Sequence, residues 1–180
     1  MALTSTIYPF DIQLADTDRG VYESVSVRLA CHPSETPEAL VCRALAYCLE
    51  YTEGIGFSAG LSDGTEPAIW VKDLTGALRC WIDIGSPDAA RLHRASKLAP
   101  RVAVYTHKDP ATLVRQLEGE RIHRREAIEL YAMDRPLLDG MVARLERRMR
   151  FDLTVADRHL FLTIGAETLT GEVRRVALGP

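Results

Sequence analysis

Two acidic residues, Glu66 and Asp83, are the strongest candidates for chemistry because they flank a predicted β-hairpin. Its strands are predicted at 68–72 and 77–84, and the sequence Asp73-Leu74-Thr75-Gly76 between them is typical of a turn. A two-residue or a four-residue turn gives the same register, which places Glu66 opposite Asp83. The Cβ atoms of directly opposed residues lie about 4.5–5.5 Å apart, so the two carboxylates would repel. A shared proton, a neighbouring cation or a divalent metal ion would relieve this repulsion.

The register of the hairpin and the role of Asp83 leave alternatives open. A three- or five-residue turn would move the two acids to opposite faces, and Pro67, which has no amide hydrogen, weakens pairing near Glu66. The register also places Trp70 opposite Arg79, which predicts a cation–π contact. Without a metal ion, Asp83 would be a polar residue near a strand end that accepts hydrogen bonds from the following turn. Periodicity alone favours neither role.

Two other motifs are weaker candidates. Residues 56–60 match the G-x-S-x-G pattern of serine hydrolases, with Ser58 as the nucleophile. That chemistry needs the serine on a turn between a strand and a helix, whereas here a helix precedes it and a polar loop follows, so an ordinary loop is favoured. Two groups of arginines are interpreted as solvated surface ahead of phosphate contacts: Arg144, Arg147, Arg148 and Arg150, and Arg121, Arg124 and Arg125.

The spacing of apolar residues predicts the elements that position these side chains. Strands at 5–15 and 21–31 form a hairpin, and Thr36-Pro37 begins a helix that is followed by a glycine-rich loop at 54–66. The remaining elements are a helix from Ser86-Pro87-Asp88, a strand at 101–106, a helix from Asp109-Pro110, a strand at 127–133, a helix at 134–147, and antiparallel strands within 151–178 that turn near 156–157 and 170–171.

The order of these elements predicts the fold class. The strand, helix and strand between residues 77 and 106 should form a right-handed parallel crossover, while the other connections are read as hairpins. The sheet is therefore mixed, and the fold class is α/β (an α+β mixed sheet). A chain of 180 residues is long enough for one domain with a substantial core, so residues 1–180 are predicted to form a single domain.

Composition excludes several classes of protein. The chain is 47% hydrophobic and 26% charged with a net charge of −3, and no apolar run is long enough to cross a bilayer. The first residues contain no basic leader, so a cytoplasmic protein is expected. The acidic balance gives no general attraction to nucleic acid. The cysteines predict neither a disulfide framework nor a zinc site, because no C-x-x-C spacing occurs among Cys31, Cys42, Cys48 and Cys80.

The chain resembles the YaeQ family of small bacterial proteins over nearly its whole length. The matching motifs, which occur in order, are Met1-Ala2-Leu3, Ile7-Tyr8, Ala15-Asp16, His32-Pro33-Ser34-Glu35-Thr36 with Glu38 and Arg43, Glu66-Pro67 with Trp70, and Trp81-Ile82-Asp83-Ile84-Gly85 with Pro87-Asp88 and Arg91. The resemblance implies a restriction-endonuclease-like variant of the PD-(D/E)XK fold, in which acids on neighbouring strands hold a divalent metal ion against a phosphodiester.

Carried onto this sequence, the resemblance implies that Glu66 and Asp83 bind Mg²⁺ or Mn²⁺. Glu38 would match an additional helical ligand, although an ordinary glutamate in the first turn of a helix is equally expected. The lysine that assists catalysis in the superfamily is replaced by Gly85. Arg91, Arg94 and Lys97 on the following helix are the candidates for its cationic role, and Arg91 and Arg94 are better placed than Lys97 because they lie nearer the start of the helix.

Two functions are therefore expected. The first is a metal-dependent nuclease or phosphodiesterase acting on DNA or RNA, in which arginine could clamp a phosphate but could not act as a base. The second is a non-catalytic binding or regulatory module that retains the nuclease-like scaffold, with its acids tied to Arg79 or to turn backbone. A serine hydrolase using Ser58 is a distant third.

Overall fold

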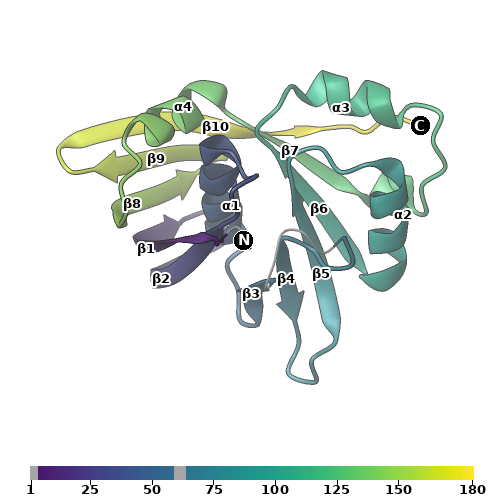
Figure 1. The fold of residues 1–180 in the computed structure, drawn as a ribbon, viewed down its shortest axis with the longest axis horizontal. Coiled ribbons are helices and arrows are strands. Elements are labelled where there is room, and N and C mark those ends of the chain that lie inside the picture. The colour runs from purple at the N-terminus through teal and green to yellow at the C-terminus, as the bar shows by residue number, and fades with distance from the viewer. Residues whose placement is uncertain (1–3, 59–63) are drawn as a thin grey trace. The chain divides into compact units, whose positions relative to one another are not determined.

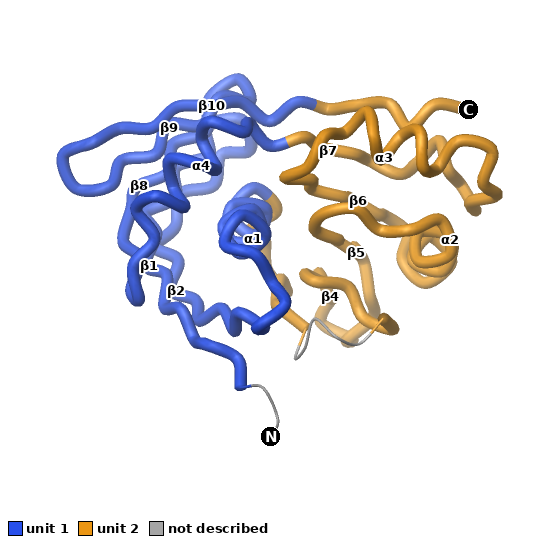
Figure 2. The backbone as a smooth tube through the Cα atoms, turned by 45° about the horizontal axis from the view of Figure 1, so that its top comes forward, with its two compact units in different colours: residues 1–49, 133–174 blue, residues 50–132, 175–180 orange. Residues whose placement is uncertain are grey.

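The computed structural model describes residues 4–58 and 64–180, and in them the chain forms ten β-strands, four α-helices and one short 3₁₀ helix (Figure 1). Parallel and antiparallel strand pairs both occur, which confirms a mixed α+β fold. By contacts the chain divides into unit 1, residues 1–49 and 133–174, and unit 2, residues 50–132 and 175–180 (Figure 2). The single domain over residues 1–180 stays a prediction. None of the described helices has the length and apolarity needed to span a bilayer.

Unit 1 is a sheet with the strand order β2-β1-β8-β9-β10 and two helices that contact each other. Its side chains alternate between buried and solvent-facing positions, as in β8, so one side of the sheet is apolar and the other polar. β1 pairs antiparallel with β2 and parallel with β8. The elements are β1 (Thr6–Asp16), β2 (Val21–Cys31), α1 (Pro37–Leu49), α4 (Arg135–Ala143), β8 (Met149–Ala156), β9 (His159–Ile164) and β10 (Glu167–Val176).

The end of the chain turns at a different place from the predicted one. The turn expected near residues 156–157 is confirmed, but the second turn lies between β9 and β10, at Gly165, and not at 170–171. Gly171 lies inside β10, where an added Cβ atom would be 2.8 Å from Cβ of Leu137 and 2.9 Å from Cβ of Asp134. The glycine is therefore explained by close packing of α4 on the strand and not by a turn.

Unit 2 is a second mixed sheet, with the order β7-β6-β5-β4-β3. β5, β6 and β7 are parallel, so the crossover between residues 77 and 106 is confirmed as a parallel connection, and a second one follows it. The elements are β3 (Ile55–Phe57), β4 (Ile69–Lys72), β5 (Leu78–Ile84), α2 (Ala89–Leu98), β6 (Arg101–Thr106), α3 (Pro110–Leu117), the 3₁₀ helix η1 (Arg125–Ala127) and β7 (Glu129–Met133). β3 lies where a loop was predicted, and α4 of unit 1 ends four residues earlier than its predicted end at 147.

The core of unit 2 lies between its parallel strands and helices α2 and α3. Trp81, Val104 and Leu130 from the strands pack with Leu92 and Leu113 from the helices. Both helices begin at the predicted aspartate caps, whose carboxylates accept backbone hydrogen bonds from the first turn. The caps fix where α2 begins and therefore which of its side chains reach back toward β5.

The interpretation of both arginine groups as solvated surface is wrong for Arg125. Arg125, expected on the solvated surface, is buried and donates to the backbone carbonyls of Leu117 at 2.6 Å and Leu178 at 2.9 Å. Its neighbour Arg124 donates to the carbonyl of Ser96 near the end of α2. Both arginines therefore complete the hydrogen bonding of buried or terminal carbonyls in unit 2.

Gly171→Ala should lower the free energy of unfolding by about 1–3 kcal/mol, because the new methyl group overpacks the contact between β10 and α4. Chemical denaturation followed by circular dichroism measures the change. Thr170→Ala, at an exposed position on the same strand, is the matched control and should stay within about 0.5 kcal/mol of wild type. Equal stability of the two variants would contradict the packing explanation.

Candidate functional site

The β4–β5 hairpin does not have the predicted register. Trp70 pairs with Trp81, two positions from its predicted partner Arg79. The amide of Asp73 donates to the carbonyl of Ala77 at 3.0 Å, so the turn contains three residues, the last of which is a glycine with φ +83°. Three-residue turns commonly end in such a left-handed residue.

A bulge adds a second shift. Lys72 pairs with Leu78 while Val71 pairs with Cys80, so Arg79 is an extra residue on β5. The turn and the bulge each shift the register by one residue in the same direction. The total shift is two residues, so each side chain stays on its predicted face of the sheet. The predicted pairing of Glu66 with Asp83 is nevertheless wrong, because β4 begins only at Ile69, which pairs with Ile82.

The bulge also changes the surroundings of Arg79 and Trp70. Arg79 forms an ion pair with Asp73 at 3.2 Å, and the ring of Trp70 is contacted instead by the ammonium of Lys72, 4.2 Å from the ring centroid. The predicted contact between Trp70 and Arg79 is therefore replaced by one within β4. The non-catalytic interpretation had expected Arg79 to neutralise Asp83. Arg79 pairs with Asp73 instead.

Asp83 is held by Arg91. Only 2% of Asp83 is exposed, and its two carboxylate oxygens accept from Nε and Nη2 of Arg91 at 2.7 and 2.8 Å. The guanidinium lies 5.3 Å from the ring centroid of Trp81. Arg91 is positioned by the beginning of α2, where the carboxylate of Asp88 accepts its backbone amide at 2.8 Å. The arrangement is a bidentate ion pair, the geometry that guanidinium and carboxylate favour.

Glu66 meets Arg91 through its backbone and not through its carboxylate. The Glu66 side chain is exposed, and its carbonyl oxygen accepts from Nη2 of Arg91 at 2.7 Å. The carbonyl of Gly64 accepts from Nη1 of Arg91 at 3.1 Å and from Nη1 of Arg94 at 3.3 Å. Arg91 and Arg94 thus hold the backbone ahead of β4, and four oxygen atoms converge on the Arg91 guanidinium.

Gly85 takes a conformation that lysine would adopt only with strain. Its φ is +94°, in the left-handed region, and its amide donates to the carbonyl of Tyr105 at 2.9 Å. The chain turns at this residue from β5 toward α2. The glycine at this position therefore has a backbone cause.

The residues do not fit a metal site in this arrangement. Glu38 lies in the first turn of α1 in unit 1, whereas Asp83, Glu66, Arg91 and Arg94 belong to unit 2. Within residues 4–58 and 64–180, no three His, Cys, Asp or Glu side chains are grouped closely enough to hold a metal ion. Magnesium and manganese bind through carboxylate oxygens, and those of Asp83 are bonded to Arg91.

In the described part of the G-x-S-x-G motif, the serine hydroxyl is hydrogen-bonded to the backbone. Ser58 follows β3, its hydroxyl donates to the carbonyl of Pro67 at 2.5 Å, and the end of the motif lies outside the described residues. No histidine contacts it among the described hydrogen bonds. The loop interpretation is therefore favoured again.

A larger polar network on the unit 2 sheet was not found from the sequence. Arg101 makes bidentate ion pairs with Glu50, at 2.6 and 3.0 Å, and with Glu129, at 2.6 and 3.1 Å. The hydroxyl groups of Tyr105 and Tyr131 donate to these two carboxylates, each at 2.6 Å, and the two rings stack with centroids 4.9 Å apart. Arg101 and Glu129 lie on predicted strands and Glu50 follows helix α1, so no local pattern in the sequence connects them.

The electrostatics of this network are those of a saturated structural cluster. Burial raises the pKa of Tyr131 to about 12, and the adjacent Glu129 carboxylate adds to the effect. Burial also raises the pKa of Cys80 to about 11. For Glu129 burial acts in the same direction, but the hydrogen bonds from Arg101 and Tyr131 outweigh it and hold the pKa below its ordinary value of 4.5. The tyrosines and the cysteine stay protonated near neutral pH, so none is an activated nucleophile.

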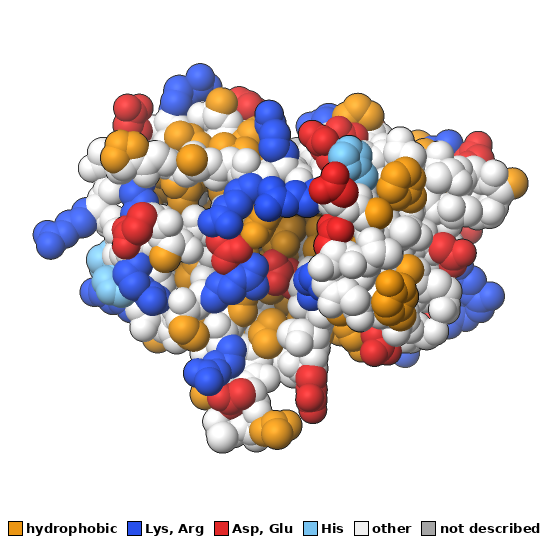
Figure 3. Space-filling view, turned by 180° about the vertical axis from the view of Figure 1, so that it is seen from behind, with side chains coloured by type: hydrophobic (Ala, Val, Ile, Leu, Met, Phe, Trp, Pro, Cys, Tyr) orange, Lys and Arg blue, Asp and Glu red, His pale blue; other side chains and the backbone are white. Residues whose placement is uncertain are grey.

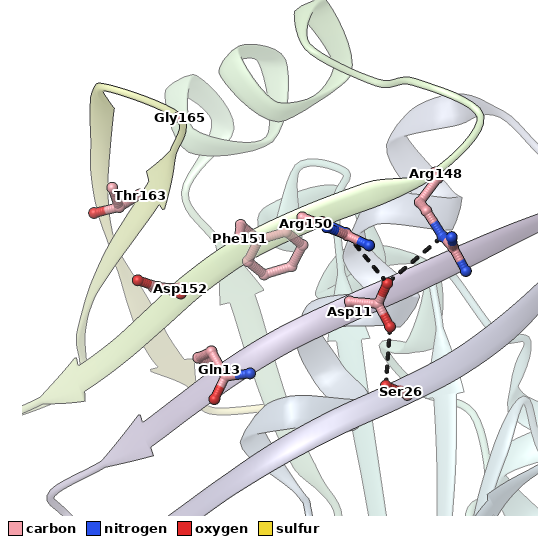
Figure 4. A pocket seen from close by; sticks show the side chains of 9 residues that line it. All are labelled: Asp11, Gln13, Ser26, Arg148, Arg150, Phe151, Asp152, Thr163 and Gly165. Carbon is pink, nitrogen blue, oxygen red and sulfur yellow. Dashed lines mark hydrogen bonds and ion pairs between the residues drawn. The ribbon is translucent and has the colours of Figure 1, made fainter.

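A third feature is the outer face of unit 1, the side of its sheet opposite the buried residues Phe10, Ile12 and Leu14. Here Asp11 accepts from the hydroxyl of Ser26 at 2.9 Å and lies 3.6 Å from Nε of both Arg148 and Arg150 (Figure 4). These side chains border a hollow of about 640 Å³, which is lined by Asp11, Gln13, Ser26, Arg148, Arg150, Phe151, Asp152, Thr163 and Gly165.

Comparison with known proteins gives the chain a clear set of relatives. A family model described as "YaeQ protein" matches residues 1–173. The chain is 30% identical to the uncharacterized protein YaeQ of Escherichia coli (strain K12) over 164 residues and to that of Salmonella typhi over 168, covering 91% of each chain in both cases. The crystal structure of a YaeQ protein from Xanthomonas axonopodis pv. citri matches with a TM-score of 0.86 at 30% identity, covering 96% of this chain and 98% of that one. One from Pseudomonas syringae gives 0.85 at 31%, covering 96% of both.

Glu129→Gln should make stability less dependent on acid pH. Because the folded-state pKa of Glu129 is lowered, its contribution is present above 4.5 and is lost as the pH falls from there through the folded-state value. Urea unfolding at a series of pH values below neutrality measures the slope. Glu126→Gln, at an exposed position in η1, is the control and should keep the wild-type slope. Identical slopes for both variants would refute the assigned role.

Proposed function

This chain belongs to the YaeQ family, and we propose that it acts as a non-catalytic binding module in which Asp83 binds an arginine of its own chain in place of a metal ion. The observation that carries the proposal is the bidentate contact of Arg91 with both carboxylate oxygens of Asp83. A catalytic metal would need at least one of those oxygens. This is the second of the two functions expected from the sequence, with Arg91 as the partner instead of Arg79.

The energetics of a buried ion pair support the proposal. Asp83 is almost fully buried, so its charge must be neutralised where it lies. Removing one partner from such a pair typically costs about 3–5 kcal/mol, because the other charge is left buried and uncompensated. A metal ion entering here would have to displace Arg91 and would then find one carboxylate, since the Glu66 side chain is exposed.

The contact surface of the proposed module is the outer face of unit 1. It carries charged, amide and hydroxyl groups around a shallow hollow, whereas Asp83, Glu50 and Glu129 of unit 2 are bound in internal ion pairs with Arg91 and Arg101. In the view of Figure 3, acidic side chains lie beside basic ones in several places. Paired surface charges of this kind suit selective contacts better than general attraction to a polyanion.

The competing proposal is a Mg²⁺- or Mn²⁺-dependent nuclease on a PD-(D/E)XK scaffold, with DNA or RNA as its substrate. The convergence of oxygens from Asp83, Glu66 and Gly64 on one positive group favours it, because a cation is already stabilised at that point. It requires Arg91 to leave Asp83, and Gly85 offers no lysine to assist a water molecule. This proposal therefore ranks second.

Isothermal titration of Mn²⁺ into wild type, Asp83→Asn and Glu66→Gln separates the two proposals. The binding-module proposal predicts that no Mn²⁺ binding depends on Asp83, so all three proteins give the same heats. Glu53→Gln, at an exposed position in unit 2, controls for weak surface binding.

The nuclease proposal would replace ours if Mn²⁺ binding were lost in Asp83→Asn. It would also require that cleavage of single- or double-stranded DNA or RNA be lost in both Asp83→Asn and Glu66→Gln.

A further inference from the structure

The hollow on the outer face of unit 1 continues into a second one of about 450 Å³, which is lined in part by Ala15, Tyr22, Ser24 and Thr154. Gln13 and Asp152 line both hollows and pair across β1 and β8, so the two form one trough. From Asp11 to Ala15 the trough follows four residues of an extended strand, about 13 Å at roughly 3.3 Å per residue. It is long enough for a short chain ligand and too shallow to enclose a compact one.

The floor of the trough carries planar groups with paired hydrogen-bonding atoms. The hydroxyl of Ser24 donates to Oε1 of Gln13 at 2.8 Å. This bond uses the amide oxygen of Gln13 and not its amide hydrogens. The carboxylate of Asp152 makes no hydrogen bond or ion pair with any residue that the structure describes. Side by side, an amide donor and a carboxylate acceptor match adjacent hydroxyl groups, each of which both donates and accepts.

The charge of the trough argues against a polyanion. Two cations, Arg148 and Arg150, line it together with three anions, Asp11, Asp152 and Glu23. Both arginines are directed at Asp11 (Figure 4). Nucleic-acid binding depends on an excess of positive charge against phosphates, and this surface has none. A ligand without net charge is favoured.

Two exposed aromatic side chains mark one end of the trough: Tyr22 lines the second hollow, and Phe161 lies farther along the same row of the sheet. Tyr22 is 63% exposed and Phe161 42% exposed. They lie in one row across the sheet, because Tyr22 pairs with Ala15, Ala15 with Thr154, and Thr154 with Phe161. The small residues between them leave space above the sheet, and exposed aromatic rings provide flat apolar surfaces beside the polar floor.

We propose that this trough binds a short, uncharged oligosaccharide. Its hydroxyl groups would bind Gln13, Asp152 and the neighbouring hydroxyls, while the apolar face of a terminal sugar ring would stack on Tyr22. The proposal rests on the proposed function, because it names the ligand class of the surface assigned there. Uncharged chains rich in hydroxyl groups satisfy all three features of the trough, namely its planar polar pairs, its lack of excess positive charge and its aromatic end.

The test is a titration of ¹⁵N-labelled protein with maltohexaose, cellohexaose and chitohexaose, followed by amide chemical shifts. At least one of them should shift amides of β1 and β8 next to Gln13 and Asp152 and saturate. Asp152→Ala and Gln13→Ala should each weaken that binding about tenfold, the loss expected when hydrogen bonds to a ligand are removed. Both positions are exposed, so the variants should fold, which unfolding curves verify.

Asp139→Asn, at an exposed position on helix α4 of the same unit, is the matched control and should bind as wild type does. The proposal is overturned if none of the three saccharides shifts these amides, if binding is unchanged in Asp152→Ala and Gln13→Ala, or if an eight-residue thymidine oligonucleotide binds there in their place. Mn²⁺ binding at Asp83 concerns unit 2 alone, so failure of the proposed function and failure of this inference give different results.

Discussion

The ion pair between Asp83 and Arg91 is the interaction on which the arrangement of unit 2 around its parallel strands depends. It joins the end of β5 to the first turn of α2, and through the carbonyls of Gly64 and Glu66 it also holds the backbone that leads into β4. A buried carboxylate must be neutralised, and a guanidinium has enough donors to neutralise it and to bind carbonyls at the same time. One arginine therefore joins α2 to the end of β5, eight residues earlier, and to the backbone of Glu66, 25 residues earlier.

Other buried acids follow the same rule. Asp16 is paired with Arg19, and Glu50 shares Arg101 with Glu129. The buried acids among the described residues are thus matched by arginine: Asp83 and Glu50 each bind a guanidinium through both carboxylate oxygens, and Asp16 accepts from the guanidinium and from the backbone amide of Arg19. The acid that the family resemblance places at a metal site obeys a structural rule that also operates away from that site. This is the main reason for preferring a binding module over a nuclease.

Local sequence signals predicted most of the elements, and long-range geometry explains where they failed. The aspartate caps, including Asp88, and the alternating strands act within a few residues and were correctly placed. The hairpin register depended on a three-residue turn and on the bulge at Arg79, and either alone would have reversed the faces. Gly171 was predicted to lie in a turn, whereas a glycine is required there by the close contact of β10 with α4.

The candidate site could be predicted only in part. Asp83 was identified from its place on a predicted strand and Arg91 from the family resemblance, but their direct pairing could not be derived from periodicity. Glu66 was placed by a register that does not occur. The network around Arg101 joins residues 51 and 28 positions apart, and no local pattern links them. Side-chain pairing across elements is decided by packing, which a single sequence does not display.

A double-mutant cycle on Asp83 and Arg91 tests the central claim most directly. The free energy of unfolding would be measured for wild type, Asp83→Asn, Arg91→Gln and the double variant. If the role of Asp83 is to pair with Arg91, each single variant is destabilised. The free energy of unfolding lost by the double variant is then smaller than the sum of the two single losses by about 2 kcal/mol or more. A coupling energy near zero, together with an Asp83→Asn variant more stable than wild type, would contradict the account. That outcome would mark Asp83 as an acid kept for function at a cost in stability.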